Sequence, residues 1–118
     1  MSHTEEWLDG YFRAWRSKNA DDVHAIFTED AEYWFQPDDP GPVRGLDAIV
    51  SMWAESKEPT EPVFEFAVLI EDEHLGIAKG WVDYPGHQRY SNLWEIRFGD
   101  DGRATRFVEW YMKATDRT

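Results

Sequence analysis

Apolar positions follow a helical period in the first half of the chain. They recur every three or four residues over 4–18 and 46–55, and over a shorter stretch that begins at residue 20. The sequence therefore predicts three helices, with Thr4 as the N-cap of the first. The expected inner stripes are Leu8, Tyr11, Phe12 and Trp15; Val23, Ile26 and Phe27; and Leu46, Ile49, Met52 and Trp53.

The second half of the chain alternates between apolar and polar positions, as strands with one buried face do. This pattern predicts strands at 63–71, 75–84, 89–98 and 104–112, preceded by an isolated strand at 31–36. Segregated helices and strands predict a single domain over 1–118 with an α+β fold, in which the helices pack on one face of an antiparallel sheet.

The last two strands form a predicted hairpin around the turn Gly99–Gly102. If Phe98 and Phe107 both face the core, the two-residue period of a strand turns Glu109 inward as well. A carboxylate on an apolar face must be hydrogen-bonded, neutral or functional. The alternative is a register shifted by one residue, with Glu109 in water and Trp110 inside.

The composition narrows the class of protein. Acidic residues number 24 against 12 basic ones, and the net charge of −12 argues against binding to nucleic acid or to an anionic membrane surface. No run approaches the roughly 20 apolar residues of a membrane span, and the N-terminus has no signal-peptide pattern, so we expect a cytoplasmic location. The chain has no cysteine and its four histidines lack metal-binding spacing, so we expect no metal and no cofactor.

A resemblance to a known family rests on three segments, FTEDAEYWFQP (27–37), PVRGLDAIVSMW (42–53) and RFGDDGRATRFVEWYM (97–112). They are similar to recurrent patterns of the nuclear transport factor 2-like superfamily, in its SnoaL-like branch. The resemblance implies a cone-shaped α+β barrel, with three N-terminal helices packed in a strongly curved, mainly antiparallel sheet. The superfamily includes isomerases, dehydratases, polyketide cyclases and proteins without catalysis, so the fold alone does not fix the chemistry.

The resemblance also assigns positions to a pocket. Tyr11 matches the donor tyrosine that ketosteroid-isomerase-like members carry on the first helix. The two acids of those members fall at Phe35 and Trp94 here, so steroid isomerisation by that route is not expected. Small residues at Ala78 and Gly80 are expected to leave room in the pocket.

The opposite, outer face of the sheet has its own apolar pattern. Ile77 and Trp81 alternate out of the pocket and lie on the same face as Trp110. Apolar patches of this kind commonly mark interfaces, so we expect a homodimer through the outer sheet face.

Two hypotheses for function remain open at this point. In the first, Glu109 acts as general acid or base, with Tyr11 as a hydrogen-bond donor, in isomerisation, dehydration or cyclisation of a small, largely apolar molecule. The expected ligand-binding residues are Trp15, Tyr33, Phe35, Trp53, Tyr84, Asn92, Trp94, Phe107 and Tyr111. In the second, Glu109 is a structural hydrogen-bonding group, and the domain binds a hydrophobic or aromatic molecule without catalysis, or serves as a dimeric scaffold.

Overall fold

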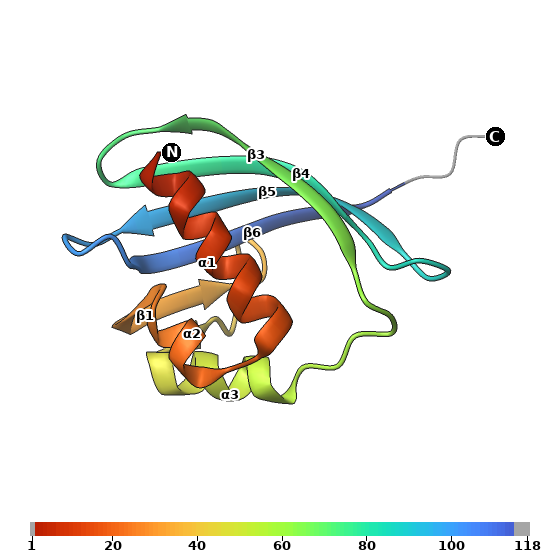
Figure 1. Ribbon diagram of the computed structural model, residues 1–118, viewed down its shortest axis with the longest axis horizontal. Helices are drawn as coiled ribbons and strands as arrows, with labels where there is room; N and C mark the ends of the chain where they lie inside the picture. The colour runs from red at the N-terminus through yellow and green to blue at the C-terminus, as the bar shows by residue number, and fades with distance from the viewer. Residues whose placement is uncertain (1, 115–118) are drawn as a thin grey trace.

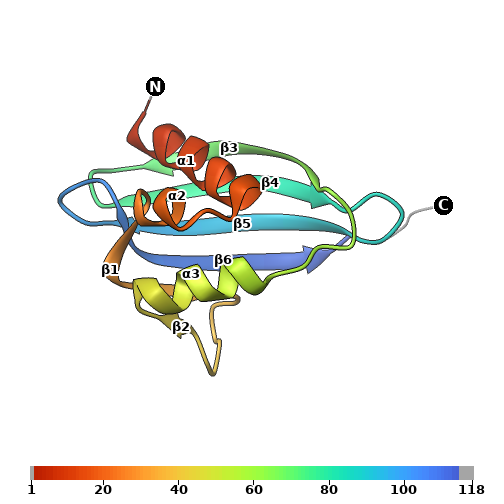
Figure 2. The ribbon, with the colours of Figure 1, turned by 60° about the horizontal axis from the view of Figure 1, so that its bottom comes forward.

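A computed structural model describes residues 2–114 as an α+β fold, with the helices gathered on one side of a sheet (Figures 1 and 2). The three helices of the described residues are α1 (His3–Ser17), α2 (Ala20–His24) and α3 (Leu46–Glu55). The six strands of this part are β1 (Phe27–Trp34), β2 (Val43–Arg44), β3 (Val63–Glu71), β4 (Leu75–Asp83), β5 (Arg89–Phe98) and β6 (Ala104–Lys113). The predicted fold class is confirmed.

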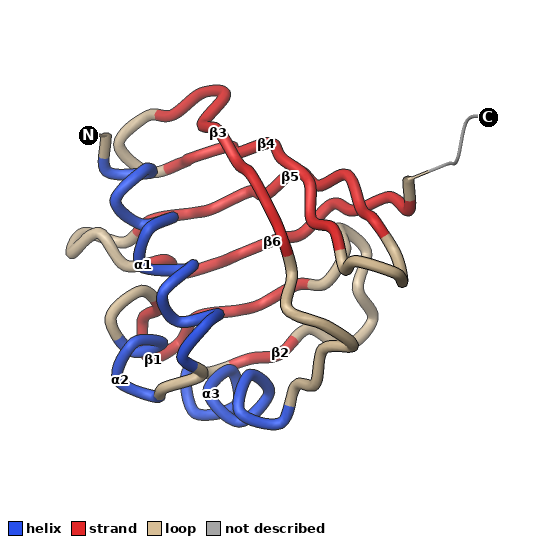
Figure 3. Tube along the Cα trace, turned by 45° about the vertical axis from the view of Figure 1, so that its right-hand side comes forward, coloured by secondary structure: helices blue, strands red, loops and turns tan. Residues whose placement is uncertain are grey.

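The strands form one mixed sheet in the order β2-β1-β6-β5-β4-β3. β1 pairs in parallel with β6, and the other neighbours are antiparallel. The sheet bends around α1, as Figure 3 shows, but β2 and β3 remain separate edges. The cone is therefore open rather than a closed barrel. No helix among the described residues is long and apolar enough to cross a membrane.

Two local predictions at element ends are wrong. The N-cap of α1 is Ser2: its side chain accepts a hydrogen bond from the Glu5 backbone N–H, and the Glu5 carboxylate accepts one from the Ser2 backbone N–H. Thr4 is instead fully buried. The first strand begins at Phe27 rather than residue 31, because Phe27 already pairs with Ala104 of β6.

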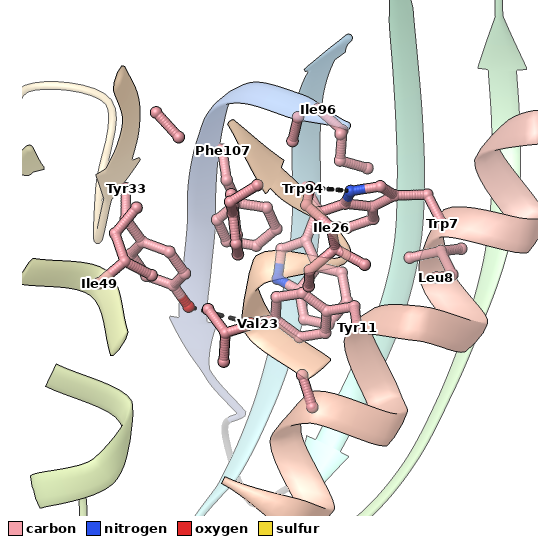
Figure 4. Close-up of a cluster of buried hydrophobic side chains, with 14 of the residues drawn as sticks. Trp7, Leu8, Tyr11, Val23, Ile26, Tyr33, Ile49, Trp94, Ile96 and Phe107 are labelled. Atoms are coloured by element: carbon pink, nitrogen blue, oxygen red, sulfur yellow. Dashed lines mark hydrogen bonds between the residues drawn. The ribbon is translucent and has the colours of Figure 1, made fainter. Parts of the chain in front are cut away.

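In the core, aromatic rings from α1 pack against rings of the sheet, among aliphatic side chains from the helices and strands (Figure 4). The Phe107 ring on β6 is fully buried and stacks against Tyr33 and Tyr11, with ring centroids 4.8 and 5.3 Å away. Trp7 from α1 lies on the same ring at 5.9 Å, and its indole N–H donates to the Ile26 carbonyl at 2.8 Å. These contacts fix the inner faces of β1 and β6 against α1.

The space expected at Gly80 is occupied. The ring of Phe66, from the neighbouring strand β3, lies directly over Gly80, and a Cβ at this position would overlap both that ring and the Glu65 carbonyl oxygen. Phe66 in turn stacks on Trp94 with ring centroids 3.8 Å apart. Glycine at position 80 thus admits a neighbouring ring rather than a ligand.

Candidate functional site

Glu109 lies on the inner face of the sheet, beside the aromatic core. It pairs with Trp94 across β5 and β6, and the next inward pair toward the turn is Ile96 with Phe107. Glu109 is partly buried, whereas Trp110 is 47% exposed on the opposite face. The inward interpretation of Glu109 therefore holds, and the shifted register does not.

The carboxyl group of Glu109 has polar neighbours from β5. The Asn92 side-chain nitrogen donates to Glu109 Oε1 at 2.7 Å. Asn92 and Trp94 are both buried, yet within the described residues Asn92 Oδ1 and Trp94 Nε1 have no hydrogen-bond partner. Because buried polar atoms are normally paired, an unmatched acceptor and an unmatched donor beside a carboxyl group fit a site for a polar ligand group.

Burial governs the protonation of Glu109. Removal from water raises the pKa of the Glu109 carboxyl above its ordinary value, and this effect outweighs the opposing polar contacts with Trp94 and Asn92. The Trp94 N–H lies close enough to favour the carboxylate, but its geometry falls short of a hydrogen bond. The carboxyl group is thus shifted toward the pH range in which it can both give and take a proton.

Two buried tyrosines stand behind this group. The hydroxyls of Tyr11 on α1 and Tyr33 on β1 are hydrogen-bonded at 2.9 Å, and each residue is 5% exposed (Figure 4). Burial is the main cause that raises the pKa of both phenols, and the nearby Glu109 charge adds to it. Both hydroxyls therefore stay neutral and retain their protons as hydrogen-bond donors.

The other expected ligand-binding residues divide into an inner and an outer group. Trp53 is buried with its ring 5.1 Å from Tyr11, whereas Phe35 and Tyr111 are 40% and 47% exposed. Tyr84, the residue after the end of β4, is partly buried. We call the exposed and partly exposed rings of Phe35, Tyr84 and Tyr111 the rim. Tyr111 lies two residues after Glu109 on β6, and Tyr84 is near enough to Glu109 to feel its charge.

Glu58, in the connection between α3 and β3, is absent from the sequence-based expectations. Its Oε1 accepts hydrogen bonds from the Trp15 indole at 2.9 Å and from Lys18 Nζ at 3.0 Å. The pKa of Tyr84 is raised first by burial, then by the charge and hydrogen-bonding proximity of Glu58, and to a lesser extent by Glu109. The only sequence signal was the place of Glu58 in a proline-containing connection.

Two hollows are well defined in the surface of residues 2–114, and Glu109 lines neither of them. The larger, about 1130 Å³, lies mainly on the outer face of the sheet, where Trp81, Leu93 and Trp110 line it. The smaller, about 330 Å³, lies beside Trp15 and Glu58. On the inner face, the rings of Trp94 and Phe107 pack together beside Glu109, so a ligand there would have to enter from the rim.

The acidic and histidine side chains of residues 2–114 do not gather into a metal centre. Among the described residues, no group of three or more His, Cys, Asp or Glu side chains is arranged to hold a metal ion.

Comparison with known proteins places the chain by fold. A family model described as a SnoaL-like domain matches residues 8–114. An NTF-2-like protein of unknown function from Burkholderia xenovorans LB400 superposes with a TM-score of 0.75 at 17% identity, over 98% of this chain and 88% of that one. A comparison with curated proteins finds no match.

Two further solved structures carry names that refer to an activity. A steroid delta-isomerase from Pseudomonas aeruginosa has a TM-score of 0.66 at 14% identity, over 95% of this chain and 81% of that one. A ketosteroid isomerase-like protein from Erwinia carotovora atroseptica SCRI1043 has a TM-score of 0.66 at 15% identity, over 93% and 94%. At these identities the likeness shows a shared fold and says nothing about the chemistry of this chain.

Proposed function

The chain belongs to the SnoaL-like domain family, and on that basis we propose that it binds a small, largely apolar molecule at the rim of the cone and transfers a proton with Glu109. The observation that carries this proposal is the group formed by the Glu109 carboxyl, the unpaired Trp94 N–H and the unpaired Asn92 Oδ1. It supplies an acid or base, a donor and an acceptor within one patch of the inner face.

The chemistry that suits this group is proton abstraction next to a carbonyl. The ionised Glu109 takes a proton from the carbon beside the carbonyl, and a neutral donor stabilises the enolate oxygen that forms. In this step the Trp94 N–H, which lies beside the Glu109 carboxyl, would turn to that oxygen, and the Tyr11–Tyr33 pair holds a further donor behind it. Isomerisation, dehydration and cyclisation all include such a step, and names of that kind occur among the structural neighbours.

Aromatic replacement of the two acids at Phe35 and Trp94 leaves Glu109 to supply the base. Phe35 is 40% exposed on the rim, and Trp94 is 2% exposed within the core. These rings suit an apolar ligand body and disfavour an anionic one, in keeping with the net charge of −12.

Deuterium exchange tests this function at the proton-transfer step itself, whatever the final product is. Small apolar ketones are incubated with the protein in D2O, and loss of the α-hydrogen signal is followed by NMR. We expect exchange above the buffer rate, reduced about 100-fold or more in Glu109→Gln. Glu95→Gln makes the same change on the outer face and should leave exchange intact. Equal rates for wild type and Glu109→Gln would rule out Glu109 as the base.

A second candidate function, a non-catalytic dimeric module, is favoured by the dense aromatic packing of the core and by the large outer hollow. That hollow holds the exposed side chains of Trp110 and Met112, which are 47% and 71% exposed. Its walls carry charges of both signs, from Glu65, Lys79 and Arg89, and so suit a second copy of the same surface. We propose that two copies pair through this outer face.

Light scattering after size exclusion tests the pairing. Met112→Arg places a charge inside the hollow and should convert a dimer to a monomer. Leu69→Arg makes the same change at a 57% exposed residue that does not line the hollow, so it should leave the dimer intact. A wild-type monomer at micromolar concentration would refute the pairing.

A further inference from the structure

The connection from α3 to β3, residues 56–62, lies close to the rim, and we call it the strap. Figures 2 and 3 show it on the helix side of the sheet, at the end where β4 and β6 stop. The Tyr84 hydroxyl lies within hydrogen-bonding reach of the Glu58 carboxylate in the strap, and it is also close enough to Glu109 to feel its charge. The strap therefore lies beside the path by which a molecule would reach Glu109 from the rim.

A single carboxylate oxygen holds most of the strap to α1. Glu58 Oε1 accepts hydrogen bonds from the Trp15 indole N–H at 2.9 Å and from Lys18 Nζ at 3.0 Å. Lys18 also donates to the Ser56 hydroxyl at the start of the strap, at 3.2 Å. Within the part of the chain that the structure describes, the backbone of residues 57–62 makes no hydrogen bond. The position of the strap thus depends on the contacts of Glu58.

The strap packs loosely against the helix that holds it. All its residues are exposed or partly exposed. The smaller hollow, about 330 Å³, has Trp15 and Arg16 of α1 in its lining together with Glu58, Thr60 and Pro62 of the strap. Segments with few buried contacts and a solvated backbone open locally at a low cost in free energy. Movement of the strap therefore needs no rearrangement of the core.

From its place beside the rim, its anchoring through one oxygen and the hollow next to it, we propose that the strap is a gate on the way to Glu109 and that Glu58 is the latch. The bonds from Trp15 and Lys18 hold the gate closed, and their release lets the strap move away from Tyr84 and admit a bulkier apolar molecule. The gate therefore limits the size of the ligand and its rate of entry. It rests on the proposed binding of a ligand beside Glu109, but not on proton transfer there.

An engineered thiol measures the gate directly, because the chain has no cysteine of its own. In Glu109→Cys, reaction of the thiol with iodoacetamide and with the bulkier N-phenylmaleimide is followed on the full-length protein by mass spectrometry. Adding Trp15→Phe removes the N–H that binds Glu58 and keeps both an aromatic ring and the net charge. We expect it to speed reaction with N-phenylmaleimide about tenfold, as for loss of a hydrogen bond to a charged group, and with iodoacetamide by less.

A second latch variant separates opening of the gate from a change in charge. Lys18→Gln also removes a bond to Glu58. By charge alone, loss of a cation would raise the pKa of a nearby thiol and slow its reaction, so a faster reaction must come from opening. Lys57→Gln makes the same substitution at an exposed residue of the strap that does not line the hollow, and it should leave the rate unchanged.

A thiol on the other face of β6 controls for loosening of the whole strand. Val108 is 7% exposed and precedes Glu109, so Val108→Cys places a buried thiol on the face away from the strap. The latch variants should leave its rate unchanged.

Three outcomes would overturn the gate. Unchanged rates for Glu109→Cys in both Trp15→Phe and Lys18→Gln would refute the latch. An equal rise for Val108→Cys would mean that β6 loosens as a whole. A rise with Lys57→Gln as large as that with Lys18→Gln would contradict the role of Glu58. Thiol labelling does not depend on catalysis, so absence of deuterium exchange would refute the Glu109 chemistry and leave the gate standing.

Discussion

The hydroxyl pair of Tyr11 and Tyr33 gives a quantitative test of the packing behind Glu109. Both residues are 5% exposed, and their oxygens lie 2.9 Å apart. Tyr33→Phe removes one hydroxyl and leaves the other buried without its partner, which costs about 1–3 kcal/mol. Tyr11→Phe should cost a similar amount. For a domain of this size, each kcal/mol lowers the melting temperature by roughly 4 °C.

The double variant separates pairing from simple loss of the two hydroxyls. Because replacing both partners leaves no unpaired hydroxyl in the pair, its cost should fall below the sum of the single costs by about 1 kcal/mol or more. Urea unfolding followed by tryptophan fluorescence measures these differences, since the rings of Trp53 and Trp94 lie within 5.1 Å of the Tyr11 ring. The urea dependence of the unfolding free energy should stay constant across the set.

A tyrosine outside the buried pair, Tyr90, serves as the matched control. Tyr90→Phe removes a hydroxyl from a partly exposed ring and should change stability by no more than about 0.5 kcal/mol. Costs for Tyr11→Phe and Tyr33→Phe that are equally small, or that add without coupling, would refute a buried pair. The hydrogen bond between Tyr11 and Tyr33 would then be absent in solution.

Three further predictions concern single residues. Gly80→Ala should destabilise the fold by about 3 kcal/mol, because the new Cβ overlaps a carbonyl oxygen and a ring, whereas Gly41→Ala, with open space around it, should be neutral in the same melt. Ser2→Ala should lower the unfolding free energy by about 1 kcal/mol through loss of the helix cap, and an unchanged stability would contradict Ser2 as the N-cap. Burial raises the pKa of Glu109 above 4.5, so the unfolding free energy of the wild type relative to that of Glu109→Gln should fall as the pH rises from below 4.5 through that raised pKa. A difference between the two unfolding free energies that stays constant over roughly five pH units, from about pH 3 to about pH 8, would contradict this.

Periodicity alone was sufficient for most elements. The apolar stripe predicted α3 at its observed bounds, Leu46–Glu55, and alternation predicted β3 and β5 at theirs. β2 was missed because two residues, Val43 and Arg44, are too short a run to show a period. The early start of β1 was missed because its residues 28–30 are polar and resemble a turn. They lie in an irregular stretch of the strand, between the pair of Phe27 with Ala104 and the pairs that begin at Glu32 with Arg106.

The sequence predicted the candidate site only to the extent that the face of a strand on which a side chain lies determines its position. The two-residue period of β6 was enough to place Glu109 inward beside Phe107. It could not show that the Phe66 ring crosses to the space above Gly80, because alternation gives the face of a side chain and not the direction of its ring. Glu58 depends on the path of an irregular connection, for which no period exists.

The pKa of the Glu109 carboxyl tests the central claim most directly. Side-chain carboxyl carbons of ¹³C-labelled glutamate are titrated by NMR, and the Glu109 signal is assigned by its loss in Glu109→Gln. A partly desolvated carboxyl suited to proton transfer should titrate above the ordinary value of 4.5. A pKa at or below 4.5 would mean that Glu109 is a solvated or charge-stabilised surface acid, and would contradict the proposed role of Glu109 in proton transfer.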